Sequence, residues 1–116
     1  MITLATLHEA TPQEIFDQVA NHLLTQNEQC ITPITKGCRY RYYNKKCAAG
    51  CLIDKDEYKR KFETKSWTML VNRKWVSAHC DNLIRSLQQV HDRHEPDKWN
   101  NELLRVAEKY NLIFNY

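Results

Sequence analysis

The sequence predicts a mostly helical α+β fold, a single domain over residues 1–116 with about four helices packed on a small antiparallel β-hairpin. Three observations lead to this prediction. Apolar residues recur at helical spacing in several segments, and one tyrosine-rich segment alternates in period two. Only two glycines and three prolines occur in 116 residues, too few for long linkers or disorder. A chain of this length is one typical domain with a modest core.

The first helix is predicted over residues 12–26, PQEIFDQVANHLLTQ. Thr11 stands at the N-cap, Pro12 at the first helical position and Glu14 three residues after the threonine, which is a capping box. The predicted apolar face consists of Ile15, Phe16, Val19, Ala20, Leu23 and Leu24.

Two conformations are compatible with the segment that follows the first helix. Residues 38–43, CRYRYY, predict a strand, and a turn at residues 44–45 would fold residues 47–53 back as its partner. Alternatively, residues 47–53, CAAGCLI, begin a helix. Cys47 and Cys51 share one face in either geometry, so we expect their sulfurs to lie near each other.

Three more helices are predicted in the second half of the chain. Residues 55–63, KDEYKRKFE, follow a second capping-box pattern and predict a short charged helix. Apolar periodicity predicts a longer helix at residues 77–94 and a last one at residues 97–112. The apolar run SWTMLV at residues 66–71 is too short to assign, and the closing IFNY at residues 113–116 is compatible with a small edge strand.

Charge is distributed unevenly along the chain. Residues 1–35 carry a net charge of −4, residues 36–75 carry +8 and residues 76–116 carry −1, within a total of +3. The middle segment is therefore where we expect an acidic partner to bind. The alternative is that the basic middle neutralises the acidic first helix within the same domain.

The basic, tyrosine-bearing middle segment is the leading candidate for a binding site. Lysine and arginine offer phosphate contacts and an exposed tyrosine offers a stacking surface, the arrangement that single-strand binders use. A solvated basic surface accounts for the same pattern. The predicted binding residues are Arg39, Arg41, Tyr43, Lys45, Lys46 and Lys59.

The cysteines predict reduced thiols and not a disulfide framework. Their number, five, is odd, and the start of the chain lacks an export signal. No stretch approaches the ~18 apolar residues of a membrane span. We therefore expect a soluble protein of the cytoplasm with no membrane partner. In that setting buried cysteines serve as small hydrophobic side chains, and the prediction is that the chain carries no cofactor.

A zinc site is one alternative role for the sulfurs, since thiolates and imidazoles are the ligands of structural zinc. The ligand set would be Cys38, Cys47, Cys51 and His79. The C-x8-C-x3-C spacing lacks the C-x2-C or C-x4-C turn that zinc knuckles present.

A thiol-dependent enzyme is the other alternative. Cys47 follows two lysines and would begin a helix in one of the two conformations, which lowers the pKa of a thiol. His91 or His79 would act as the base. The sequence shows no nucleotide loop, paired catalytic carboxylates or recognisable triad, so it predicts binding in preference to catalysis.

The segments CRYR, KCAAGCLI, DEY and LIRSLQQVHD resemble a family of small, uncharacterised proteins of tailed bacteriophages and prophages with a K-C-A-x-G-C-L-I motif. The resemblance covers most of the chain, from EATPQEIF to the last helix. It implies no known activity and no catalytic residues. It does imply a phage accessory protein in the bacterial cytoplasm that binds a host macromolecule, a protein or nucleic acid with an acidic surface.

Overall fold

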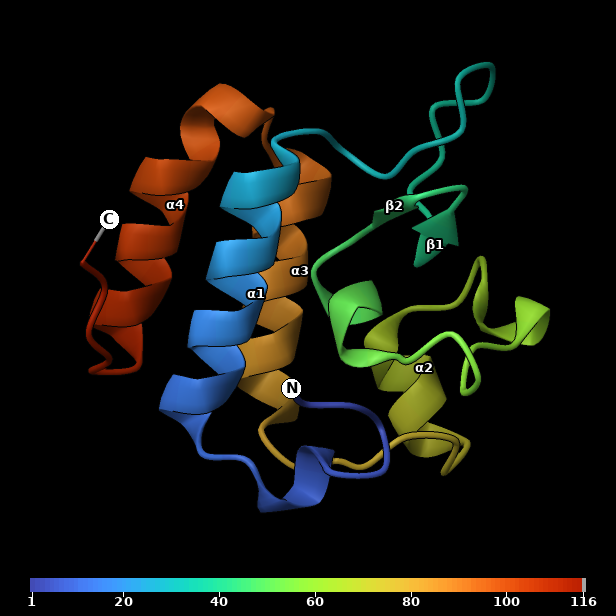
Figure 1. Cartoon of the computed structure of the whole chain (residues 1–116), viewed down its shortest axis with the longest axis horizontal. Helices are drawn as coiled ribbons and strands as arrows, with labels where there is room; N and C mark the ends of the chain where they lie inside the picture. The colour runs from blue at the N-terminus through green and yellow to red at the C-terminus, as the bar shows by residue number, and fades with distance from the viewer. Residues whose placement is uncertain (116) are drawn as a thin grey trace.

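Three helices pack against one another as a bundle, with a fourth, shorter helix beside them (Figure 1). The bundle consists of α1 (Pro12–Gln26), α3 (Asp81–Arg93) and α4 (Pro96–Lys109), and the short helix is α2 (Trp67–Asn72). This computed structural model describes residues 1–115. The predicted α+β fold with four helices and a small hairpin is confirmed. No helix in the described part of the chain is long and apolar enough to cross a bilayer.

Helix α1 begins and ends as local sequence chemistry requires. The amide of Glu14 donates to Thr11 Oγ1 at 3.1 Å, and the Thr11 amide donates to Glu14 Oε1 at 2.8 Å, so the predicted capping box is formed. The helix ends at Asn27, a residue type that tolerates the left-handed conformation it adopts there with φ 51°. The prediction for residues 12–26 is confirmed.

The hairpin is present, but its turn lies one residue earlier than predicted. Strand β1 (Arg41–Tyr42) pairs with β2 (Lys45–Lys46), with Arg41 opposite Lys46. The turn is therefore at residues 43–44 and not at 44–45. Burial explains this register, because it places Tyr40, 6% exposed, and Cys47, 1% exposed, together at the core edge of the hairpin.

Residues 47–53 follow the helical alternative in a short form. A 3₁₀ helix spans Ala49–Leu52, and the Cys51 amide donates to the Cys47 carbonyl at 3.1 Å. This turn packs against both α1 and α3, so it lies between the hairpin and the bundle. Gly50 lies so close to the hairpin that a Cβ atom there would be 2.0 Å from the carbonyl oxygen of Tyr40.

The prediction of a helix over residues 55–63 is wrong. A turn and a short 3₁₀ helix, Arg60–Phe62, occupy this segment. Long-range hydrogen bonds account for the difference: the Glu57 carboxylate accepts from the amides of Leu4 at 2.8 Å and Ala5 at 2.9 Å. These hydrogen bonds fix the segment to residues 4–5 near the N-terminus, and it does not continue as a helix.

The fourth helix is formed instead by the apolar run that the sequence left unassigned. In α2, the N-cap Ser66 accepts a hydrogen bond on its Oγ from the Met69 amide at 3.2 Å. Trp67 and Leu70 are buried on its inner side. Packing, and not length or periodicity, therefore stabilises this helix of six residues.

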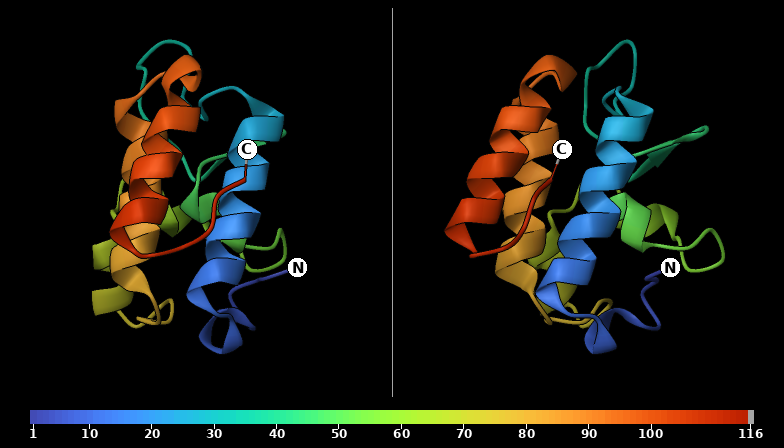
Figure 2. Two further views of the ribbon diagram at one scale, coloured as in Figure 1. Left: turned by 90° about the vertical axis from the view of Figure 1, so that its left-hand side faces the viewer. Right: turned by 60° about the vertical axis from the view of Figure 1, so that its left-hand side comes forward.

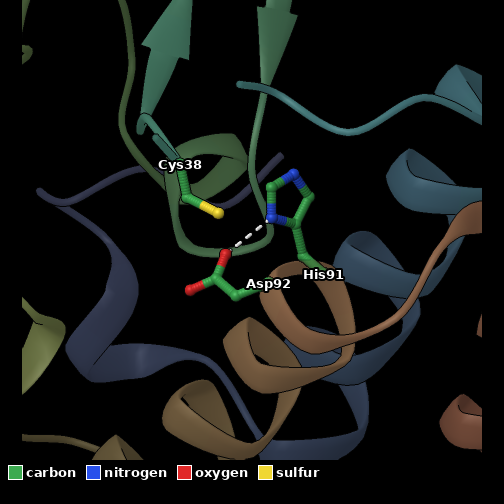
Figure 3. A group of neighbouring side chains, drawn as sticks. All are labelled: Cys38, His91 and Asp92. Carbon is green, nitrogen blue, oxygen red and sulfur yellow. Dashed lines mark hydrogen bonds and ion pairs between the residues drawn. The ribbon is translucent and has the colours of Figure 1, made fainter. Parts of the chain in front are cut away.

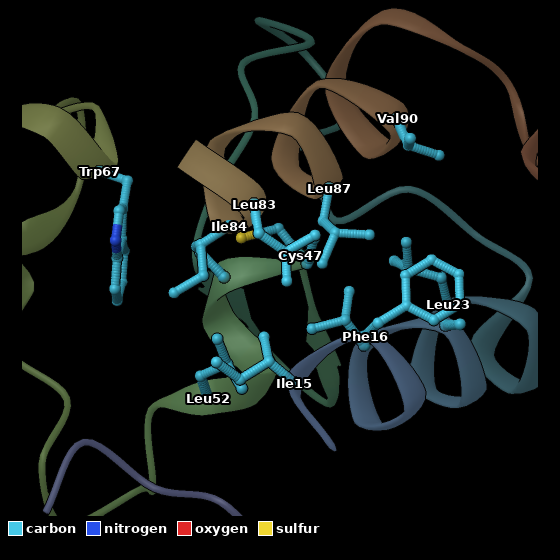
Figure 4. Packing of buried hydrophobic residues seen from close by; sticks show 14 of the residues in the cluster. Ile15, Phe16, Leu23, Cys47, Leu52, Trp67, Leu83, Ile84, Leu87 and Val90 are labelled. Carbon is cyan, nitrogen blue, oxygen red and sulfur yellow. The ribbon is translucent and has the colours of Figure 1, made fainter. Parts of the chain in front are cut away.

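Apolar side chains from the bundle, α2 and the 3₁₀ turn form one core (Figure 4). After α4 the chain runs back beside α1 (Figure 2), where Gln13 Oε1 accepts from the Ile113 amide at 2.9 Å. Residues 113–115 form no strand, and residue 116 lies outside the described residues. Labelled core residues in Figure 4 include Ile15, Phe16, Leu23, Cys47, Leu52, Trp67, Leu83, Ile84, Leu87 and Val90.

Candidate functional site

The fold separates the charges of the chain into two sides. Residues 36–75, with net charge +8, form the hairpin, the 3₁₀ turns and α2, which lie together beside the bundle (Figure 1). The bundle helices belong to the segments with net charges of −4 and −1. Among residues 1–115, the ion pair between Lys45 and Glu28 is the only one that joins residues 36–75 to the rest. Ion pairs with the acidic N-terminal segment therefore neutralise little of the positive charge of residues 36–75.

Tyr43 lies at the tip of the hairpin, with 84% of its surface exposed. Its φ of 56° is uncommon for a bulky side chain, because the left-handed region crowds Cβ against the backbone. Its ring meets Tyr42 edge-on, with 4.7 Å between the ring centroids, and Lys45 and Lys46 begin β2 after one intervening residue, Asn44. An exposed aromatic ring in a basic segment is the combination that single-strand binders use for base stacking.

Two of the predicted binding residues hold the hairpin in place. Arg39 Nε lies 3.5 Å from Glu63 Oε1, and Arg41 Nη2 donates to the Ile53 carbonyl at 3.2 Å. Lys45 pairs with Glu28, while the exposed Lys59 stands on the same basic side. Arg39 and Arg41 thus hold the hairpin in position, and Tyr43 and the lysines are the side chains that a partner could contact.

The sequence did not predict a second aromatic group on this side of the molecule. The half-exposed ring of Trp75 is approached by three cations: Lys61 Nζ at 4.2 Å, the Arg73 guanidinium at 5.2 Å and Lys65 Nζ at 5.9 Å from the ring centroid. We call these four residues the Trp75 cluster. The sequence does show basic residues on both sides of the apolar run at residues 66–71. No periodicity, however, predicts that they surround one ring. The cluster extends the basic surface beyond the hairpin.

Cys38, His91 and Asp92 form the one group of three potential metal ligands in the described residues (Figure 3). One ligand atom from each lies within 4.8 Å of the other two. Cys38 is exposed, contrary to a purely internal role for the sulfurs, while His91 is fully buried. The chemistry of the group depends on which nitrogen of His91 carries the proton.

Two hydrogen bonds assign the tautomer of His91. The Cys30 amide donates to Nε2 at 2.8 Å, so Nε2 must be an acceptor. Nδ1 faces Asp92 Oδ1 at 2.7 Å and therefore carries the proton and donates it to that oxygen. Neither nitrogen keeps a free lone pair for a metal ion or for a thiol proton. His91 in this arrangement is a structural residue that joins the backbone at Cys30 to α3.

The pKa values of three thiols are raised, which makes them poor nucleophiles. Although Cys38 is exposed as a residue, partial desolvation of its sulfur, together with the charge of Asp92, raises the pKa of this thiol to about 12. Burial also raises the pKa of Cys47 well above its ordinary value and that of Cys51 to about 12. These thiols stay protonated at neutral pH, whereas a nucleophilic cysteine needs a lowered pKa and a free base. The arrangement of Cys47 and His91 offers neither.

The four residues of the hypothetical zinc set are not gathered in space. No three of Cys38, Cys47, Cys51 and His79 bring ligand atoms within 4.8 Å of one another in residues 1–115. His79 Nε2 instead donates to the Ala10 carbonyl at 2.6 Å. The Cys47 sulfur accepts from the Gly50 amide at 3.2 Å, a contact within its own turn.

Comparison with known proteins finds no matching family model, no matching curated protein and no matching solved structure. Function therefore has to follow from the chemistry of the surface. Five of the predicted binding residues lie in or next to the hairpin, and the exposed Lys59 and the Trp75 cluster belong to the same basic segment, residues 36–75. The structure leaves the predicted thiol and zinc residues without the geometry that either chemistry needs.

His22 joins α1 to the hairpin and makes stability depend on pH. Its Nε2 donates to the Lys46 carbonyl at 3.0 Å, and burial lowers its pKa from the ordinary 6.5. Below about pH 6.5 the unfolded chain therefore takes up a proton that the folded protein resists, so the free energy of unfolding falls as pH falls. We expect His22→Gln to reduce this fall between pH 7.5 and 5.5 in urea unfolding. His8→Gln, at an exposed position, is the control, and equal slopes for H22Q and the parent protein would refute the link.

Proposed function

We propose that the protein binds single-stranded nucleic acid through the basic side formed by residues 36–75, and that it catalyses no reaction. The observation that carries the proposal is the exposed ring of Tyr43 at the hairpin turn beside Lys45 and Lys46. Tyr43 is the first residue of the two-residue turn, where tight hairpin turns take a positive φ, so the turn itself leaves the ring in solvent. Stacking of one base on this ring would contribute about 1–3 kcal/mol.

Electrostatics supports a polyanion as the partner. The net charge of +8 on one side attracts phosphates, and counterion release adds affinity at low salt. The Trp75 cluster offers further cations around a half-exposed ring. The ion pair between Arg39 and Glu63 joins the hairpin to the segment that carries Lys59, Lys61 and Lys65, which holds these two basic parts in a fixed relation.

The setting is part of the same proposal and rests on the resemblance to phage accessory proteins. A phage protein in the bacterial cytoplasm would meet host nucleic acid there. The second candidate partner is an acidic host protein, because the same lysines would pair with carboxylates. Base stacking at Tyr43 favours nucleic acid over a protein surface.

The proposal is tested by fluorescence anisotropy with a labelled 12-nucleotide oligothymidylate across 50–200 mM salt. We expect affinity to fall with salt and Tyr43→Ser to weaken binding about 5- to 150-fold, the equivalent of one stacked base. Lys59→Gln should reduce the slope of log K against log salt by about 0.7, the value for one phosphate contact on a single strand. Lys98→Gln, on α4 of the bundle, is the matched control and should change neither quantity.

Three outcomes would contradict the proposal. They are a lack of salt-dependent binding, unchanged affinity in Y43S, and an equal effect of K59Q and K98Q. Salt-dependent binding of polyglutamate without binding of the oligonucleotide would favour the acidic protein partner instead.

A further inference from the structure

A cavity of about 480 Å³ lies between the hairpin side of the molecule and α3. Its wall is built from residues 38–40, residues 64–68 and the face of α3 that carries Arg85 and Asp92. The volume is within the range of about 300–1,000 Å³ found for small-molecule sites. Tyr43 and Trp75 do not line it, so the two aromatic rings lie outside the cavity, although Arg39 and Lys65 belong both to its wall and to the basic side.

One buried nitrogen on the wall of this cavity lacks a partner. Trp67 is 2% exposed, and its Nε1–H makes no hydrogen bond in residues 1–115. Arg39 also lines the wall, but its Nε faces Glu63 Oε1 at 3.5 Å, and Glu63 is not part of the lining. A buried donor without an acceptor costs about 1–3 kcal/mol, and over 90% of buried polar groups in proteins are paired. An acceptor inside the cavity would satisfy the Trp67 N–H.

The charges of the wall indicate the kind of acceptor. Arg39, Lys65 and Arg85 line the cavity, against Asp92 as the single acid. The Asp92 carboxylate is already engaged, since its Oδ1 accepts from His91 Nδ1 at 2.7 Å and from Gln88 Nε2 at 2.8 Å. An excess of cations and N–H donors suits an oxyanion, and guanidinium groups match phosphate geometry especially well.

We propose that this cavity binds the phosphate group of a small phosphomonoester, with the Trp67 indole N–H as one donor and Arg85 as the main charge partner. The hydroxyls of Ser66 and Thr68 lie on the same wall; they accept from the Met69 amide and from Arg85 Nη1, so their protons can be donated to phosphate oxygens. This proposal does not depend on nucleic-acid binding by the basic side.

Titration monitored on the indole N–H signals in a ¹⁵N–¹H correlation spectrum tests the proposal. The probes are inorganic phosphate, AMP, adenosine and acetate. We expect the Trp67 signal to move saturably with phosphate and with AMP, and not with adenosine or acetate. Arg85→Gln should weaken both responses about tenfold, the loss of one charged hydrogen bond. Arg105→Gln, exposed on α4 and outside the cavity, is the control and should bind as the parent does.

Several results would overturn the proposal. A Trp67 signal that stays fixed up to 20 mM phosphate excludes the site, and a response to adenosine or acetate equal to that of AMP excludes phosphate as the recognised group. An unchanged response in R85Q removes its charge partner. The variant Y43S separates the two proposals, because it should lose oligonucleotide affinity and keep the phosphate response.

Discussion

Replacing Gly50 by alanine is expected to lower the free energy of unfolding by about 3 kcal/mol, at the upper end of the cost of overpacking. A Cβ atom at this position would lie 2.0 Å from the carbonyl oxygen of Tyr40 and 3.0 Å from its carbonyl carbon. These are backbone atoms, so no side-chain rotation relieves the clash. The hairpin would have to move away from the 3₁₀ turn, which exposes the buried Tyr40 and Cys47.

Gly37→Ala is the matched control, because it adds the same methyl group at an exposed position. The nearest atom to a Cβ there is Thr35 Oγ1 at 3.5 Å, an ordinary contact, and neither glycine has a positive φ. We expect its unfolding free energy to stay within about 1 kcal/mol of the parent. Urea unfolding of both variants measures the difference. Equal stabilities for G50A and G37A would show that the hairpin and the 3₁₀ turn do not approach each other this closely.

The contrast between α1 and the hairpin shows how far local sequence determines this fold. The first helix is predicted to the residue, because its capping box involves only Thr11 and Glu14, three positions apart. The hairpin register was missed because it depends on the approach of Gly50 to Tyr40, a tertiary contact with no sequence signature. The wrong helix prediction at residues 55–63 has a similar reason. The spacing of Glu57 from Asp54 fits a helix cap, yet the Glu57 carboxylate also accepts a hydrogen bond from the amide of Leu4.

The candidate site divides in the same way. Tyr43 alternates with Arg39 and Arg41 in the predicted strand, so alternation placed these three on one face, and Lys45 and Lys46 follow within three residues. The Trp75 cluster draws Lys61, Lys65 and Arg73 from irregular segments on both sides of α2, which no periodicity connects. His91 was identified as a reactive candidate from its residue type. Its role is decided by the Cys30 amide, 61 positions away, which occupies Nε2.

Replacing Glu63 by glutamine is the second change with a large expected effect, a loss of about 3 kcal/mol in unfolding free energy, as for breaking a buried ion pair. The carboxylate is 8% exposed. It accepts from the Tyr40 amide at 3.0 Å, the Arg41 amide at 3.3 Å and the Tyr58 hydroxyl at 2.6 Å, and it lies 3.5 Å from Arg39 Nε. An amide group keeps the shape but turns two donors toward this set of donors and leaves the arginine without its counter-charge.

Glu28→Gln provides the comparison, because it also removes one carboxylate that pairs with the basic segment, but at an exposed position. Its pair with Lys45 is on the surface, so we expect a loss of less than about 1 kcal/mol in urea unfolding. Glu63 also anchors the hairpin through the amides of Tyr40 and Arg41. Hydrogen exchange of these two amides should therefore accelerate in E63Q and stay unchanged in E28Q. If E63Q is as stable as E28Q and protects both amides, Glu63 does not hold the hairpin against the rest of the protein.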